Sequence, residues 1–250
     1  MSSLLVPEHL LALLAVAVGC GLLCLVARSP GRGPSAAALL LGAVIVVAEA
    51  AWWFHLVRIA AWSPQLGLPL QLCDAAALVG AAALWTRRQT LVELAYFWAC
   101  GGTVQALLTP DLAQRFPDPL YFQYYLAHGG VVAAALFLVV GSRQAPRPGA
   151  VLRVLALTAA FTGLVAVVDA ATGANYMYLR QPPPAPTLLD ALGPWPRYLF
   201  GAVALGVALL LVLDAPFRLG RRGASLEGPA EDRRAGAKGA EGAGPDVTVA

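Results

Sequence analysis

The chain has 250 residues, of which 59% are hydrophobic and only 12% are charged, and its formal net charge at pH 7 is +3. Soluble domains of ordinary composition carry about 25% charged residues, so this composition excludes a soluble enzyme that is merely tethered to a membrane. The small net charge gives no sign of a nucleic-acid partner, and we expect none. The sequence predicts an integral membrane protein.

Apolar stretches recur along the chain, each close to the roughly 20 residues that a helix needs to cross the hydrocarbon core of a bilayer. Clusters of proline, glycine and arginine separate them, as expected where helices end. The predicted fold class is therefore all-α, a polytopic bundle of seven transmembrane helices that occupies residues 1–213. The predicted spans are residues 9–27, 38–60, 69–86, 91–108, 120–140, 151–172 and 195–213.

Lysine and arginine are unevenly divided between the two sides of this bundle. The connections after the first, third and fifth spans, together with the C-terminal segment, hold thirteen of them, whereas the other side holds only Arg58, Arg115, Arg180 and Arg197. Basic residues are enriched on the cytoplasmic side of membrane proteins. We therefore predict an N-terminus outside, a cytoplasmic C-terminus and a location in the cell membrane.

Residues 214–250 differ from the rest of the chain in composition. Glycine, alanine, glutamate and arginine dominate this segment, and large apolar residues are few. Such a segment cannot bury a hydrophobic core of its own. It is predicted to be a polar, disordered cytoplasmic tail.

Several kinds of chemistry are excluded by the residue types present. The one lysine, Lys238, lies in the tail, which excludes a Schiff-base pigment inside the membrane. The four cysteines lie in apolar runs without a CxxC pair, so neither a disulfide framework nor a zinc site is expected. We expect no cofactor and no metal ion.

Polar residues at membrane depth are the candidates for function, because a charged side chain at the centre of a bilayer costs about 2.5–3.5 kcal/mol. With the predicted orientation, most of them fall in the outer half of the membrane, which predicts a polar cavity that opens outward. A structural role as an interhelical hydrogen-bond or ion-pair partner stays open for several of them. The candidates are Gln71, Cys73, Asp74, His55, Arg58, Gln105, His128, Asp169 and Asn175.

Four separated strings resemble a known family. They are LPLQLCD at 68–74, YFWACGGTVQALLTPDL at 96–112, FP at 116–117 followed by YFQYYLAHGG at 121–130, and GANYMYL with LLDALGPWP at 173–179 and 188–196. In this order they resemble the YwaF family of bacterial integral membrane proteins, which is related to the transmembrane protein 164 family. The resemblance spans roughly residues 38–213.

The resemblance implies an activity. The eukaryotic relatives are acyltransferases that remodel ether phospholipids and use a cysteine and a histidine, and by matching motif these residues are Cys73 and His128. The resemblance also shows a departure, because many members have histidine where this chain has Gln71. Membrane lipids are the substrates that this activity implies.

The implied chemistry is a two-step acyl transfer or an acyl hydrolysis. His128 would activate the thiol of Cys73, which would attack an acyl ester and hold the acyl chain as a thioester. Gln71, Gln105 or Asn175 could donate hydrogen bonds to the tetrahedral oxyanion. Asp74 could orient the histidine or hinder formation of the thiolate, and the sequence leaves both roles open.

Two other classes of function remain as alternatives. The first is a non-catalytic membrane scaffold or sensor. The second is a carrier for a small solute, with its path lined by His55, Arg58, Asp74 and Asp169. No inverted repeat of the kind found in many transporters is visible, and the sequence does not predict an oligomeric state.

Overall fold

The structure is a computed structural model of the chain that describes residues 6–183 and 188–240. The chain forms two compact units, Met1–Leu213 and Asp214–Ala250. Within the described residues all regular structure is helical, which confirms the predicted all-α fold class. The elements are α1 (Pro7–Arg28), α2 (Gly33–Arg58), α3 (Leu72–Thr86), α4 (Gln89–Trp98), η1 (Ala99–Thr103), α5 (Val104–Leu108), α6 (Pro119–Leu136), η2 (Phe137–Gly141), α7 (Ala150–Thr172), η3 (Tyr176–Tyr178), α8 (Leu188–Ala191) and α9 (Arg197–Ala240).

Six helical segments are long and apolar enough to cross a membrane: Pro7–Arg28, Gly33–Arg58, Gln89–Leu108, Pro119–Gly141, Ala150–Thr172 and Arg197–Arg221. The remaining predicted span, residues 69–86, is the shorter apolar helix α3, which has 15 residues. At 1.5 Å per residue α3 is about 22 Å long, less than the roughly 30 Å thickness of the hydrocarbon core. It begins late because Pro69 cannot donate a backbone hydrogen bond and because Gln71 and Asp74 form a capping box at its start.

Residues 214–240 continue α9, and residues 241–250 lie outside the described residues. Within the second unit, Asp214 forms ion pairs with Arg218 and Arg221 along the helix. The cytoplasmic location and the disorder of residues 214–250 stay predictions.

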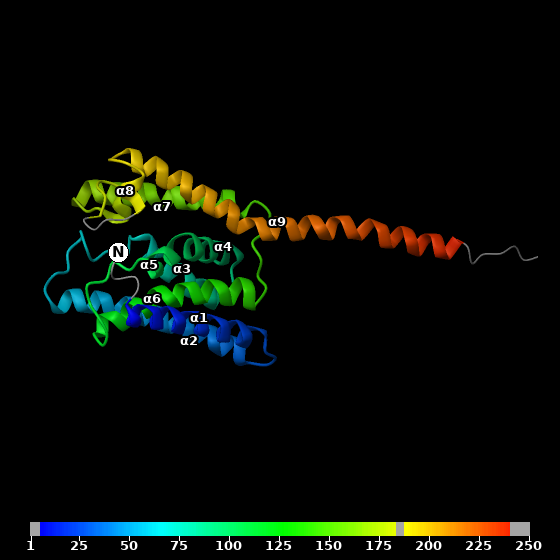
Figure 1. Cartoon of the computed structure of the whole chain (residues 1–250), viewed down its shortest axis with the longest axis horizontal. Helices are drawn as coiled ribbons and strands as arrows, with labels where there is room; N and C mark the ends of the chain where they lie inside the picture. The colour runs from blue at the N-terminus through cyan, green and yellow to red at the C-terminus, as the bar shows by residue number, and fades with distance from the viewer. Residues whose placement is uncertain (1–5, 184–187, 241–250) are drawn as a thin grey trace, which may run out of the picture. The chain divides into compact units, whose positions relative to one another are not determined.

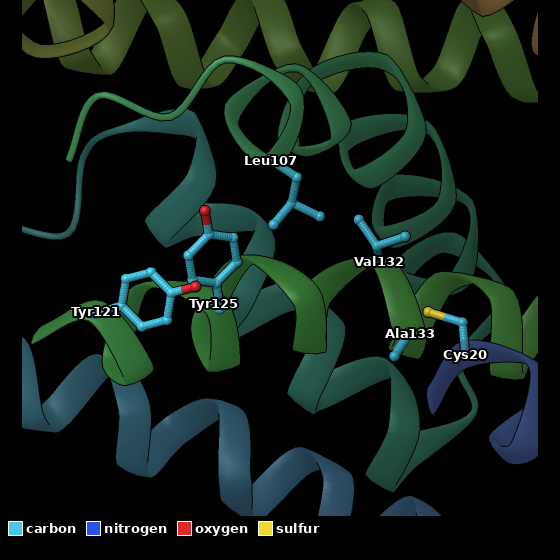
Figure 2. Close-up of a cluster of buried hydrophobic side chains, with 6 residues drawn as sticks. All are labelled: Cys20, Leu107, Tyr121, Tyr125, Val132 and Ala133. Carbon is cyan, nitrogen blue, oxygen red and sulfur yellow. The ribbon is translucent and has the colours of Figure 1, made fainter. Parts of the chain in front are cut away.

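Helix α6 is the centre of the first unit. It packs against α1, α2, α3, α4 and η1 (Figure 1), and most residues of the segment Pro119–Gly141 that it begins are buried. Its sequence places glycine and alanine over most of its second half, and small residues let helices in a membrane approach closely. A buried cluster joins α6 to α1 and α5 (Figure 2); it contains Cys20, Leu107, Tyr121, Tyr125, Val132 and Ala133.

The connections α1–α2, α3–α4 and η2–α7 lie together at one end of the bundle, which we call the arginine-rich end. There Arg28 donates a hydrogen bond to the carbonyl of Val140, and Arg87 donates one to the hydroxyl of Ser142. The connections α2–α3, α5–α6 and α7–α8 lie at the opposite end, which we call the loop end (Figure 1). The side of the membrane that each end faces stays a prediction.

One carboxylate secures the arginine-rich end. Glu93 of α4 is fully buried, and its oxygens accept hydrogen bonds from the side chains of Arg147 and Arg153 at 2.9–3.3 Å and from the backbone N–H of Arg147 at 2.9 Å. Arg147 lies in the η2–α7 connection and Arg153 in the first turn of α7. Glu93 therefore joins α4 to the η2–α7 connection and to the first turn of α7.

We predict that Glu93→Ala lowers the free energy of unfolding by about 2–3 kcal/mol, because it removes several charge-assisted hydrogen bonds and leaves two arginines without their partner. Thermal or denaturant unfolding in detergent measures the change. Glu8→Ala is the matched control: Glu8 and Arg115 form an exposed pair at 4.0 Å, which is worth less than about 1 kcal/mol. Equal losses in the two variants would contradict the role given to Glu93.

Candidate functional site

Cys73 lies in the first turn of α3, at the loop end, and its side chain is half-buried. Asp74 follows it directly in the same turn. The helical segment Ala99–Thr103, which packs against α3, ends at Thr103. The Thr103 hydroxyl is buried and has no hydrogen-bond partner among the described residues.

Thr103 reaches this position through an irregularity in its helix. Residues Ala99–Thr103 form the π-helical segment η1 between α4 and α5. A π-helical turn holds an additional residue and changes the direction of the side chains that follow it, and such turns are frequent at functional sites. η1 packs against both α3 and α6.

His128 lies on α6, one turn after Tyr124. The two rings are stacked, with centroids 4.1 Å apart and planes inclined by 25°. His128 Nδ1 lies 3.0 Å from the carbonyl oxygen of Tyr124. A carbonyl can only accept, so Nδ1 carries the proton of the neutral ring and Nε2 keeps the free lone pair. Nε2 is the atom that could accept a proton.

Tyr124 contacts His128 and is itself held by α5. Its hydroxyl donates a hydrogen bond of 2.7 Å to the carbonyl of Ala106 in α5, which holds the ring in place. In the part of the chain that the structure describes, no hydrogen bond joins Cys73 directly to His128. The two predicted catalytic residues are related through their helices, since α3, which carries Cys73, packs against α6, which carries His128.

Gln71 and Asp74 belong to the polar contacts that hold the loop end together. The backbone N–H of Gln71 donates to a carboxylate oxygen of Asp74 at 3.2 Å, and Gln71 Oε1 accepts a 2.9 Å hydrogen bond from the backbone N–H of Met177. Since Oε1 faces Met177, the two N–H groups of the Gln71 amide remain as donors. Gln71 therefore connects the start of α3 to η3.

Asp169 and Asn175 also lie at the loop end, where their side chains form hydrogen bonds with the backbone of the connection after α7. One oxygen of the buried Asp169 carboxylate accepts from the backbone N–H of Tyr176 at 3.0 Å, and the other has no partner among the described residues. The Asn175 side chain donates to the carbonyl of Gln181 and accepts from the backbone N–H groups of Arg180 and Gln181. Among the described residues, the hydrogen bonds of the Asn175 side chain thus lie within its own loop.

His55, Arg58 and Gln105 are not brought to Cys73. His55 stacks on Trp52 with ring centroids 5.9 Å apart, and the exposed Arg58 lies over the ring of Phe54. The side chain of Gln105 is exposed. Of the predicted cavity residues, the structure places Gln71 and Asp74 beside Cys73.

Sequence reasoning missed two residues of this site, Thr103 and Tyr124. The i, i+4 spacing of Tyr124 and His128 was a usable signal, because such residues lie on the same face of a helix. No comparable signal marks Thr103, because its position depends on the π-helical turn. Within the described residues, no three His, Cys, Asp or Glu side chains lie close enough together to hold a metal ion.

Tyr176, which follows α7, is hydrogen-bonded to the α2–α3 connection at the loop end. Its hydroxyl donates to the carbonyl of Pro64 at 3.0 Å and accepts from the backbone N–H of Leu68 at 2.9 Å. Burial raises the pKa of the Tyr176 phenol, so the group stays protonated at neutral pH and can make both hydrogen bonds. The residue therefore fixes the α2–α3 connection that leads into Gln71 and Cys73.

We predict that Tyr176→Phe destabilises the protein by about 1–3 kcal/mol, because it leaves the Pro64 carbonyl and the Leu68 N–H without their shared partner. Hydrogen exchange of residues 63–71 should accelerate more than exchange in α6. Tyr96→Phe, at a tyrosine whose hydroxyl bonds to the carbonyl of Leu213, is the matched control and should leave exchange in residues 63–71 unchanged. Unchanged exchange in Tyr176→Phe would contradict this role.

The sequence model of the TMEM164 family matches residues 4–214 of the chain. This match includes α1, for which the sequence strings gave no family signature. None of the curated proteins and none of the solved structures compared with the chain matches it. Because the family match covers most of the chain, the protein, with its multi-pass helical bundle, belongs to the TMEM164 family.

Proposed function

We propose that the protein is a lipid acyltransferase or acyl hydrolase that uses Cys73 as nucleophile and His128 as general base. The observation that carries the proposal is the stacking of His128 on Tyr124 in α6, the helix that packs against α3, which carries Cys73. The hydrogen bond from His128 Nδ1 to the Tyr124 carbonyl supports it further, because it leaves Nε2 as the basic nitrogen.

In the first step, His128 Nε2 takes the proton of the thiol and Cys73 Sγ attacks the carbonyl carbon of an acyl ester. The tetrahedral oxyanion collapses as the carbon–oxygen bond breaks, and the departing lysolipid oxygen takes the proton from His128. The acyl chain is then held on Sγ as a thioester. In the second step, His128 deprotonates the hydroxyl of an acceptor, which attacks the thioester and releases the thiol. Water as the acceptor gives hydrolysis.

The oxyanion needs donors of hydrogen bonds. Among the predicted donors, Gln71 fits best, because its oxygen is fixed on the Met177 N–H and its amide N–H groups are left to donate. The amide of Asn175 is bound within its own loop, and the side chain of Gln105 is exposed. Thr103 is a further donor, because its buried hydroxyl has no partner among the described residues and its segment packs against α3.

The finer parts of the sequence interpretation belong to the same proposal. The resemblance of four strings supports membership of the bacterial YwaF branch, and the excess of arginine at one end supports an N-terminus outside and a cytoplasmic C-terminus. With that orientation the loop end, and with it Cys73, faces outward in the cell membrane. Phospholipids would reach the site sideways from the bilayer.

We predict that purified protein transfers or hydrolyses the acyl chain of a phospholipid and that both activities fall by at least about 100-fold in Cys73→Ala and in His128→Ala. Intact-mass spectrometry should detect an acyl adduct on the wild type and none on Cys73→Ala. Cys24→Ala, which removes a cysteine of α1, is the matched control and should remain active. Absence of transfer, hydrolysis and adduct from the wild type would leave the scaffold and carrier alternatives.

The role of Tyr124 gives a separate prediction. Tyr124→Phe keeps the stacked ring and loses only the hydrogen bond to Ala106, so we expect kcat/KM to fall by less than about tenfold, the factor that corresponds to 1.4 kcal/mol. Tyr124→Leu removes the stacking and should approach His128→Ala. Activity that is kept in Tyr124→Phe and lost in Tyr124→Leu, together with a changed pH profile in Tyr124→Leu, would identify Tyr124 as a positioning residue. Equal losses in both variants, with an unchanged pH profile, would contradict this role.

A further inference from the structure

An apolar groove runs along α1 where this helix lies on α6. Its volume is about 470 Å³, within the range of about 300–1,000 Å³ that is usual for small-molecule sites. On α1 the lining extends from Glu8 to Leu23, a length of about 22 Å at 1.5 Å per residue. An apolar groove of this length is long enough to hold an extended acyl chain.

One end of this groove has a negative charge in its lining and a positive charge beside it. Glu8 lines the groove, and the guanidinium of Arg115 lies 4.0 Å from its carboxylate. Both side chains are partly open to the surroundings, with exposed fractions of 30% for Glu8 and 73% for Arg115. A phosphate would pair with the arginine and an ammonium group with the glutamate. This arrangement is complementary to a zwitterionic head group.

The N-terminal end of α1, which forms this charged end, is fixed on α6. The backbone carbonyl of Glu8 accepts a 2.6 Å hydrogen bond from the hydroxyl of Tyr121, and buried His9 is hydrogen-bonded to the hydroxyl of Tyr125 at 2.6 Å. Both tyrosines line the groove, and they lie one turn apart on α6 (Figure 2). The charged end and the apolar walls are therefore held in one rigid arrangement.

The lining of the groove does not include Cys73, Tyr124 or His128. On α6 the groove is lined by Tyr125, Gly129 and Ala133, which recur every four residues. Tyr124 and His128 form the neighbouring row, turned by about 100° around the helix. A lipid in the groove would lie against α1, on a different face of α6 from the stacked histidine.

We propose that this groove binds one acyl chain of a phospholipid with a zwitterionic amine head group, whose phosphate lies beside Arg115 and whose ammonium group lies beside Glu8. A second groove along α1, of about 510 Å³, is lined by apolar residues and cysteines without a charged side chain. It provides an internal comparison, because lipid that merely fills apolar surface would occupy both grooves without preference for a head group.

The test is native mass spectrometry of the full chain in detergent with added dioleoyl phosphatidylethanolamine. In Gly19→Leu the new side chain enters the groove, since a Cβ on Gly19 meets no atom within 4 Å, and bound lipid should fall by about tenfold. Gly163→Leu on α7 also meets no atom within 4 Å and should bind as the wild type. If Gly19→Leu does not fold, Ala15→Leu fills the same groove. Wild-type binding by a folded groove-filling variant would overturn the proposal.

The head group is tested with phosphatidylglycerol of the same acyl chains. The wild type should prefer the ethanolamine lipid, Glu8→Gln should lose this preference, and Arg115→Gln should weaken binding of both lipids. Equal retention of the two lipids by the wild type would mean general surface lipid only and would overturn the proposal. Cys73→Ala should bind the lipid as the wild type does, so this proposal and the proposed acyl transfer fail independently.

Discussion

The close approach of α1 and α2 to α6 is the constraint on which the bundle depends. A Cβ atom on Gly129 would lie 2.7 Å from Val16 of α1, and one on Gly130 would lie 2.8 Å from Ile45 of α2. Farther along, a Cβ on Gly141 would lie 2.6 Å from Ala27. Lipid chains are as apolar as the helices, so association relies on such close packing rather than on a hydrophobic driving force. The glycine pair directly follows His128, and the packing of three helices therefore also sets the position of the imidazole.

Polar contacts stabilise the bundle in addition to this packing, and they are concentrated at its two ends. At the arginine-rich end, Glu93 gathers two arginines and a backbone N–H around one buried carboxylate. At the loop end, Tyr176 and Gln71 join the connection before α3 to the connection after α7. Backbone groups outside regular helices need such partners at the edge of a membrane. The loop end is also where the candidate site lies, so the contacts that close the bundle position its chemistry.

The candidate site and the proposed lipid groove use different faces of α6. One face carries the stacked pair Tyr124 and His128, and the neighbouring face carries Tyr125 and Gly129 toward α1. A single central helix can serve both because its side chains diverge by about 100° from one residue to the next. The two sites can thus be altered separately, although both depend on the same glycine pair for the fit of the surrounding helices.

The amino-acid sequence by itself determined the class of the protein and the approximate place of every span, because hydrophobic length and the shortage of charge are properties of composition and order alone. It also marked Cys73 and His128 as candidates. The span predicted from the sequence begins three residues before α3, because Pro69 and the capping box formed by Gln71 and Asp74 delay the start of the helix. Only the tertiary structure decided which polar residues meet. Arg58 and Gln105 are exposed, whereas Thr103 lies in a π-helical turn that packs against α3 and Tyr124 stacks on His128. The direction of a side chain around its helix depends on such local geometry and on the neighbouring helices, and neither is encoded in hydropathy.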